Sequence, residues 1–408
     1  MPAFTEHPTL IMVFSAVLAV ALSLSAYNWQ LTAAAPSLLY SPLIAQKVLK
    51  TLQTQPSGSF SYPQYTNASN PGIWHWDPVD YWTSGFLPAT LYALHEREKL
   101  CPGSGAGVDW LALGRSWSAP LVKIAQKNSV QHDVGFISYA FVKELELNPT
   151  NTTAKNLINQ FAKDLTDRYN PAVGCTASWD GPTDSDCRVI MDNMMNLELL
   201  FQSSALTGNK TLIDIAISHA DKTIENHIRS DGGSFHVVDY DAHTGAVKWR
   251  RTSQGYADNS TWARGQAWGI YGFATIYKYT TKDRYLKTAQ KLADYFLSRL
   301  SASGVPNWDF DAPASLRFAD TSAGTIAANG FLLLAELDKP NKNKWTNAAT
   351  KLLEDTAKLA WKPEWQSLLS NGTVNQPAGN FLTGIVYGDY YYITAGNTLL
   401  SRGVTACP

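Results

Sequence analysis

The sequence of 408 residues has little net charge and no motif typical of a metal site. Its 33 lysines and arginines nearly balance its 34 aspartates and glutamates, which gives a formal net charge of −1 without a long run of one sign. This balance argues against binding to nucleic acid through a basic surface. The eight histidines and four cysteines form neither a His-x-x-x-His nor a Cys-x-x-Cys pattern, so we expect no metal and no other cofactor.

Long apolar runs are also absent, with one exception near the N-terminus. Residues 10–26 are almost purely apolar, although no lysine or arginine precedes them. This run predicts a secretory signal peptide, with a signal anchor as the alternative, that ends at residue 26 or as late as residue 35. We therefore expect a leader over 1–26, a single domain over 36–408, secretion through a eukaryotic pathway, and a mature monomer that is free of the membrane.

Glycosylation sequons and cysteines agree with export. The five sequons are at Asn67, Asn151, Asn209, Asn259 and Asn371. In an oxidising compartment, four cysteines predict two disulfide bonds. Because Cys175 and Cys187 flank one short loop, we expect them to pair, which leaves Cys101 to pair with Cys407. The first bond would close a flap that carries Trp179.

Hydrophobic periodicity predicts about twelve helices and few strands. Amphipathic helices alternate with helices that are apolar nearly all round, and short polar links join them in pairs. We therefore predict an all-α fold, an (α/α)6 barrel of six outer and six inner helices with long loops on one rim. The predicted helices span 41–54, 82–97, 108–126, 134–146, 152–169, 189–206, 209–227, 260–279, 281–300, 320–337, 341–359 and 388–401. The longest loop, 228–259, is expected to hold a β-hairpin around His243-Thr244-Gly245.

One inner helix carries three glycines on a single face. In the segment TWARGQAWGIYGF, residues 261–273, Gly265, Gly269 and Gly272 fall at i, i+4 and i+7. Relative to alanine they disfavour the helix by roughly 2.5–3 kcal/mol. We expect close packing around the barrel axis to offset this cost.

The inner helices begin with acidic and aromatic residues, which places these side chains on a common rim. Asp192 lies among apolar neighbours, where desolvation would raise its pKa and suit it to donate a proton; a buried structural carboxylate is the alternative. Asp133 is a candidate for a second carboxylate on the rim, but from the local sequence alone a helix N-cap role is favoured. An N-cap role is favoured for Asp80, Asp320 and Asp389.

Other side chains on this rim could form a sugar pocket. Arg264 would bind an anionic ligand or satisfy a buried acid. His236 lies in the long hairpin loop, where an exposed histidine without a role in the site is slightly favoured. Four tryptophans offer flat faces to sugar rings, although half of them are expected in the core: Trp82, Trp179, Trp262 and Trp268. Two carboxylates, an arginine and aromatic platforms together indicate an enzyme that acts on glycans.

Six segments resemble, in the same order, segments of the unsaturated glucuronyl hydrolases, glycoside hydrolase family 88. They are YWTSGF (81–86), HDVGF (132–136), IMDNMMNLELLF (190–201), WARGQAWGIYGF (262–273), DTSAGTIAANG (320–330) and GDYYY (388–392). The resemblance covers roughly residues 40–402. It implies an (α/α)6 barrel without a cofactor, whose substrates are oligosaccharides left by polysaccharide lyases. The expected reaction hydrates the C4=C5 vinyl ether of the 4,5-unsaturated glucuronic acid at the non-reducing end.

The resemblance also implies roles for individual residues. Asp192 matches the general acid and base of the family, and Asp133 matches an assisting aspartate. The positions that match the sugar pocket are Trp82, Trp179, His236, Gln254, Trp262, Arg264, Trp268 and Tyr390.

Other functions stay open at this point. An unsaturated rhamnogalacturonyl hydrolase would share the barrel and the chemistry, but it typically shows Gly-Asn-Gly-Trp where this chain has RGQAW at 264–268. An ordinary inverting glycosidase would act on saturated glycans, and a non-catalytic glycan-binding protein would need neither Asp133 nor Asp192. We therefore favour the glucuronyl interpretation.

Overall fold

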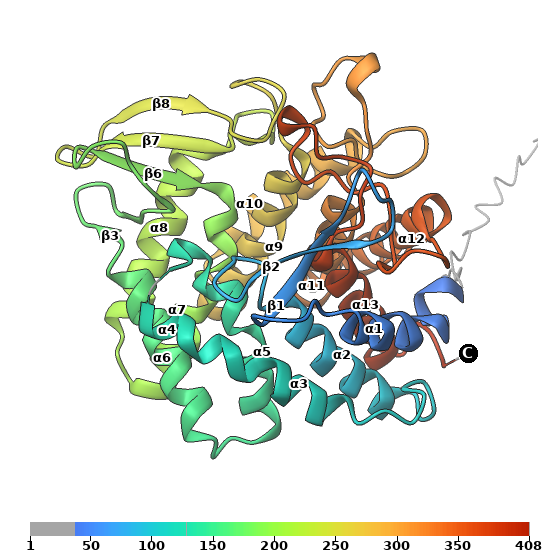
Figure 1. Cartoon of the computed structure of the whole chain (residues 1–408). Helices are drawn as coiled ribbons and strands as arrows, with labels where there is room; N and C mark the ends of the chain where they lie inside the picture. The colour runs from blue at the N-terminus through green and yellow to red at the C-terminus, as the bar shows by residue number, and fades with distance from the viewer. Residues whose placement is uncertain (1–36, 128, 408) are drawn as a thin grey trace, which may run out of the picture. The chain divides into compact units, whose positions relative to one another are not determined.

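The computed structural model describes residues 37–407 except residue 128 (Figure 1). The predicted leader lies outside these residues. No helix among the residues described is long and apolar enough to cross a membrane.

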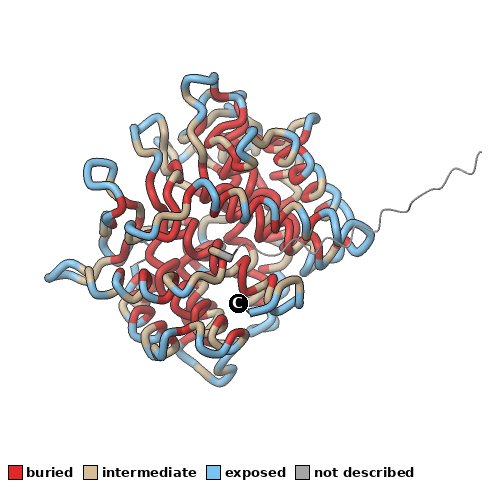
Figure 2. The backbone as a smooth tube through the Cα atoms, turned by 90° about the vertical axis from the view of Figure 1, so that its right-hand side faces the viewer, coloured by how far each residue is buried: buried red, intermediate tan, exposed pale blue. Residues whose placement is uncertain are grey.

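Six inner elements form a closed ring in which each contacts the next and the last contacts the first. They are α2 (Phe86–Leu100), α5 (Val134–Leu147), the 3-10 turn η4 (Met191–Met195) continued by α7 (Glu198–Thr207), α9 (Ala263–Thr280), α11 (Thr321–Leu337) and α13 (Val386–Ser401). Most residues of these elements are buried, on all faces of the helices and not on one face alone, as their apolar sequences predict (Figure 2).

Amphipathic helices surround this ring and bury one face against it. They are α1 (Leu43–Gln53), α3 (Trp110–Ser118) continued by η2 (Ala119–Lys123) and α4 (Ile124–Lys127), α6 (Thr152–Thr166), α8 (Thr211–His227), α10 (Asp283–Ser298) and α12 (Lys342–Ala360). The predicted (α/α)6 barrel is therefore confirmed.

Short strands lie at the rim where the inner helices begin. Strands β1 (Ser61–Thr66) and β2 (Trp74–Pro78) form a hairpin, and β3 (Tyr169–Asn170) pairs with β4 (Cys175–Thr176). A four-stranded antiparallel sheet has the order β5 (Trp179–Asp180), β6 (Asp186–Ile190), β7 (Val237–Asp241) and β8 (Val247–Arg251). Strands β7 and β8 confirm the hairpin expected in 228–259. Figure 1 shows β6, β7 and β8 beside α8 at the upper left.

The helix predicted over 189–206 begins later than expected. Residues 186–190 form strand β6, and residues 191–195 form the tight turn η4 before α7 starts at Glu198. Strand pairing with β7 extends through Ile190, so the backbone is extended where the apolar pattern suggested a helix. Asp192 therefore lies in a 3-10 turn, not in an α-helix.

The predicted disulfide between Cys175 and Cys187 is wrong, because both residues are free, buried thiols. Strand pairing holds this segment instead: Cys187 lies opposite Asp180, while Cys175 lies opposite Asn170 in a separate ladder. Burial raises the pKa of the Cys187 thiol to about 11, which keeps it protonated.

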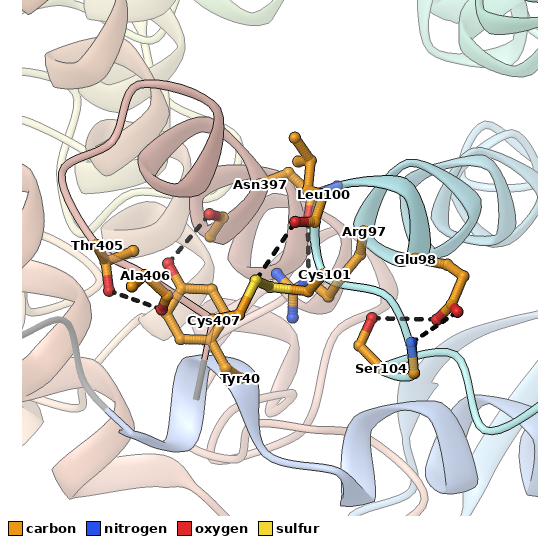
Figure 3. The surroundings of a disulfide bond; sticks show 12 residues. Tyr40, Arg97, Glu98, Leu100, Cys101, Ser104, Asn397, Thr405, Ala406 and Cys407 are labelled. Carbon is orange, nitrogen blue, oxygen red and sulfur yellow. Dashed lines mark hydrogen bonds between the residues drawn. A yellow bond between two sulfur atoms is a disulfide. The ribbon is translucent and has the colours of Figure 1, made fainter.

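The second predicted disulfide, between Cys101 and Cys407, is confirmed (Figure 3). It joins the end of α2 to the chain beyond α13 across a separation of 306 residues, with 5.6 Å between the Cα atoms. Nearby, the buried Arg97 of α2 donates hydrogen bonds of 2.8 Å to Leu39 O, Ile393 O and Asn397 Oδ1. These bonds tie the first described residues to α2 and α13, where the ring closes.

The aspartates expected as N-caps differ in their roles. Asp320 caps α11, since its carboxylate accepts from the amides of Ser322 and Ala323. Asp133 precedes α5 but makes no capping bond, and Asp80 lies exposed in a turn. Asp389 is not a cap: it lies inside α13 and accepts hydrogen bonds from the amides of Leu368 and Leu369.

The turn η4 packs against the face of α9 that carries the glycines. A Cβ atom built at Gly272 would lie 2.5 Å from Met194 Cβ and 3.0 Å from the Met194 carbonyl carbon, and one at Gly269 would lie 3.1 Å from Met191 Sδ. Only glycine allows so close an approach. The expected close packing is therefore observed, and it fixes the turn that contains Asp192.

Candidate active site

Asp192 lies at the centre of the rim where the inner helices begin. Met191 and Met194, on either side of it in η4, pack against α9, and the side chain of Asp192 is 12% exposed. Its Oδ2 atom has no hydrogen-bond partner among the described side chains and backbone groups. Burial raises its pKa from 3.8 to about 6, against the lowering effect of the Arg264 guanidinium. A carboxyl group in this state can donate a proton near neutral pH.

His236 presents an N–H group to Asp192. Its Nδ1 accepts from the Ser253 amide at 3.3 Å and lies 3.1 Å from the Thr252 hydroxyl, so the ring proton is assigned to Nε2. Nε2 lies 3.8 Å from Asp192 Oδ2. Burial, followed by the charge of Arg264, lowers the pKa of His236 well below its usual value, so the ring is neutral. It stacks on Trp262 with 4.2 Å between ring centroids.

Half-buried Asp133 and buried His132 form a second pair. His132 Nδ1 lies 2.7 Å from the carbonyl oxygen of Ser178, which can only accept, so Nδ1 carries the ring proton. His132 Nε2 is then an acceptor, and it lies 3.3 Å from Asp133 Oδ1. Burial raises the pKa of Asp133 well above its usual value, and the charge of Asp192 adds to this effect. A protonated Asp133 therefore fits the free acceptor on His132.

Arg264 is fully enclosed and already paired. It forms an ion pair with Asp320 at 2.9 Å and donates to Thr373 O at 2.6 Å and to Val374 O at 2.8 Å. Of the two uses considered from the sequence, these contacts fit the satisfaction of a buried acid. The guanidinium also lies 4.4 Å from the Trp262 ring, and its charge acts on Asp192 and His236 from behind.

Three of the predicted tryptophans lie around this cluster. Trp268 is buried with its indole Nε1 unpaired, and its ring lies 5.2 Å from that of Phe136. Half-buried Trp82 lies 5.2 Å from the Tyr387 ring. The Trp179 ring approaches His236 edge-on at 6.3 Å.

The last two predicted pocket residues lie farther from the carboxylates. Gln254 donates to Val374 O at 3.0 Å, the same carbonyl that Arg264 contacts. Tyr390 packs on Tyr139 at 5.7 Å and lines a cavity of about 240 Å³ at the opposite end of the barrel. The structure therefore does not bring Tyr390 to the cluster around Asp192.

Sequence reasoning missed three residues that the structure places in the cluster. Tyr387, one turn before Tyr390, lies 5.6 Å from Arg264 and keeps an unpaired hydroxyl. His132 stands next to Asp133 in the quoted HDVGF segment, and its position there was the available signal. Thr252 fixes the His236 ring, but nothing in the local sequence indicates this contact.

The fold and the site define the chain as a barrel enzyme that acts on glycans. No protein-family model matches it. The chain is 36% identical over 355 residues to the unsaturated glucuronyl hydrolase of Formosa agariphila, which covers 84% of this chain and 86% of that protein. It is 30% identical over 345 residues to the unsaturated chondroitin disaccharide hydrolase of Streptococcus pyogenes, over 78% of this chain and 86% of that protein. A crystal structure of an unsaturated glucuronyl hydrolase specific for heparin matches with a TM-score of 0.81 and 27% identity, over 91% of this chain and 99% of that one.

The chain belongs to the family of unsaturated glucuronyl hydrolases, and it is a glycosidase.

Proposed function

We propose that this glycosidase removes the 4,5-unsaturated glucuronic acid from the non-reducing end of lyase-generated oligosaccharides. The observation that carries the proposal is the environment of Asp192: a desolvated carboxyl with a pKa near 6 and an unpaired oxygen, which faces the N–H of His236 at 3.8 Å. The relatives named above support the substrate class, because each is named for unsaturated glucuronyl or unsaturated chondroitin units.

In the proposed reaction, Asp192 acts first as an acid and then as a base. Its proton adds to C4 of the vinyl ether, and positive charge develops at C5 and the ring oxygen. A water molecule attacks C5 and returns a proton to Asp192. The resulting hemiketal opens to a ketone at C5, which leaves a hemiacetal at C1. This hemiacetal breaks down to an aldehyde and releases the remaining saccharide, so one water is consumed.

The neighbouring side chains have distinct parts in this proposal. Neutral His236 donates a hydrogen bond from Nε2, while protonated Asp133, held by His132, binds substrate hydroxyls and adds no second negative charge. Trp82 and Trp179 supply faces for the sugar rings. Arg264 stabilises the ionised form of Asp192 from behind the site.

The decisive test is turnover by the Asp192→Asn variant. The conjugated C4=C5 bond absorbs in the ultraviolet, so hydration bleaches the signal. We expect wild-type protein to bleach unsaturated disaccharides from at least one of chondroitin, hyaluronan or heparin, and Asp192→Asn to lower kcat by about 10²–10⁴-fold with little change in binding.

Asp294→Asn, on the exposed face of α10, is the matched control and should keep full activity. Full turnover by Asp192→Asn would refute the assignment of Asp192. If wild-type protein bleached only unsaturated rhamnogalacturonan fragments, the glucuronyl substrate would be wrong while the hydration chemistry would stand.

A further inference from the structure

The outer face of the β5–β8 sheet carries a straight row of side chains. Trp179 of β5 lies opposite Arg188 of β6, and Arg188 lies opposite Asp239 of β7. Asp239 in turn lies opposite Trp249 of β8. Directly paired residues of antiparallel strands point to the same face, so these four side chains form one line, which we call the sheet row. The opposite face is buried and contains Cys187, Val189, Val238 and Tyr240.

The sheet row is continuous with the candidate active site. At one edge, the Trp179 ring lies 6.3 Å from that of His236. At the other edge, β8 is followed directly by Thr252, which contacts His236 Nδ1 at 3.1 Å. Asp239 is the third residue after His236 along the chain, about 10 Å away in extended backbone. A linear chain that leaves the site can therefore reach the row.

Trp249 is the large apolar side chain that the row exposes. It is 69% exposed, and no aromatic ring or cation among the described residues stacks on it. Single exposed apolar residues are common and need no explanation on their own. Trp249 differs because its position in the row sets it in line with a tryptophan that borders His236. An indole ring can stack on the apolar face of a sugar.

Two arginine side chains on this face are exposed enough to contact an acidic ligand. Arg188 and Arg251 share the single carboxylate of Asp239, with Arg188 Nε at 3.1 Å from it. The arginine side chains are 27% and 31% exposed, whereas that of Asp239 is 8% exposed. Nearby Lys248 is neutralised by Asp186 at 2.8 Å. Among Arg188, Arg251 and Asp239 one positive charge is in excess, while Asp241 also acts on Lys248 and Asp258 on Arg251.

We propose that the sheet row binds the saturated sugars that follow the unsaturated ring in an acidic oligosaccharide. The inference rests on the proposed function, which puts the unsaturated ring beside His236. The barrel core closes the pocket below, so the remaining sugars must leave across the rim. There Trp179 and Trp249 contact sugar faces, and Arg188 and Arg251 bind carboxylate or sulfate groups.

The test compares a short and a long substrate. Unsaturated disaccharide and unsaturated hexasaccharide from one polysaccharide, chosen by the panel above, are assayed with wild-type protein and with Trp249→Ala. We expect KM for the hexasaccharide to rise roughly 2- to 10-fold in the variant. The KM for the disaccharide and kcat for both substrates should stay unchanged, because Trp249 does not reach the reacting atoms.

Two further variants keep the interpretation specific. Trp249→Phe should recover most of the hexasaccharide affinity, because it keeps an aromatic face. Arg251→Gln should also raise KM for the hexasaccharide and weaken its dependence on salt, whereas Lys351→Gln on α12, which likewise removes a cation paired with an aspartate, should not.

An unchanged KM for the hexasaccharide, or an equal change for both substrates, would overturn the proposal. If wild-type protein turned over neither substrate, the proposed function would fail instead. The surface is then tested by calorimetric titration of wild-type protein and Trp249→Ala with the hexasaccharide; equal affinities would overturn it.

Discussion

Several side chains at the candidate active site bury a polar atom without a partner in the described part of the chain, and three of these atoms are Asp192 Oδ2, His236 Nε2 and Trp268 Nε1. Burial of one such group costs about 1–3 kcal/mol. The fold keeps all three within one cluster, beside the fully paired Arg264. A ligand that hydrogen-bonds to them would recover this cost, so the site is destabilised in favour of binding.

The charge state of Asp192 should therefore affect stability. Its folded pKa of about 6 lies above the ordinary 3.8, so its contribution is fully present below about pH 4 and is lost as the pH rises through 6. A difference of about two pKa units corresponds to about 3 kcal/mol. We expect Asp192→Asn to unfold at higher urea concentration than wild type at about pH 8, with the advantage shrinking as the pH falls to about 4. A gain of equal size at both pH values would contradict this.

The glycine face of α9 shows how one element positions another. Gly269 and Gly272 of α9 allow η4 to approach the helix backbone, and this approach sets the position of Asp192 on the rim. A single methyl group in this contact is therefore expected to act on catalysis as well as on folding.

Gly272→Ala tests this coupling. The added Cβ would lie 2.5 Å from Met194 Cβ, so η4 must shift. Overpacking costs about 1–3 kcal/mol, partly offset by the better helix propensity of alanine. We expect a net loss of stability and a fall in kcat of about tenfold or more, measured by urea denaturation and by the bleaching assay. Gly388→Ala, whose Cβ would have its nearest neighbour at 3.4 Å, is the matched control and should change neither quantity in this way.

The helices could be predicted from the sequence because their signals are local. The apolar pattern of α9 and α11 repeats over several turns, so both helices and their burial follow from spacing alone. The β7–β8 hairpin could be predicted, but its pairing with β5 and β6 could not, because the sheet joins strands from two separate loops and β5 has only two residues. Because these pairings cannot be seen in the sequence, the spacing of Cys175 and Cys187 predicts a disulfide where strand pairing holds the segment instead. In the site, the apolar neighbours of Asp192 indicate its burial, and Asp133 is indicated only by the resemblance to the family. The contact between Thr252 and His236 cannot be predicted, because it depends on how the hairpin folds back.

The closure of the ring is the main feature at the scale of the whole molecule. Arg97 and the bond between Cys101 and Cys407 both act at the end of α2, where the first described residues meet α13 (Figure 3). Asp192 lies at the other end of the barrel, and α2 alone extends about 22 Å. The contacts that close the ring of helices and the candidate active site therefore lie at opposite ends of the barrel.

Removal of the disulfide should affect stability without affecting turnover. The bond closes a loop of 306 residues, and loss of a native disulfide costs about 2–5 kcal/mol. We expect Cys407→Ser to lower Tm while kcat and KM at 25 °C stay at wild-type values. Dithiothreitol should lower the Tm of wild type to that of the variant and leave the variant unchanged. A variant with the wild-type Tm would show that the bond adds nothing to stability.

One carbonyl group joins the two sides of the rim. Val374 O accepts from Gln254, in the loop that follows the β7–β8 hairpin, and from Arg264, at the start of α9. The loop at 371–385 and the loop at 252–259 therefore share an anchor, and neither can swing outward alone without breaking it. Displacement of the 252–259 loop would also move Thr252, so the position of the His236 ring depends on this hydrogen bond between the two loops.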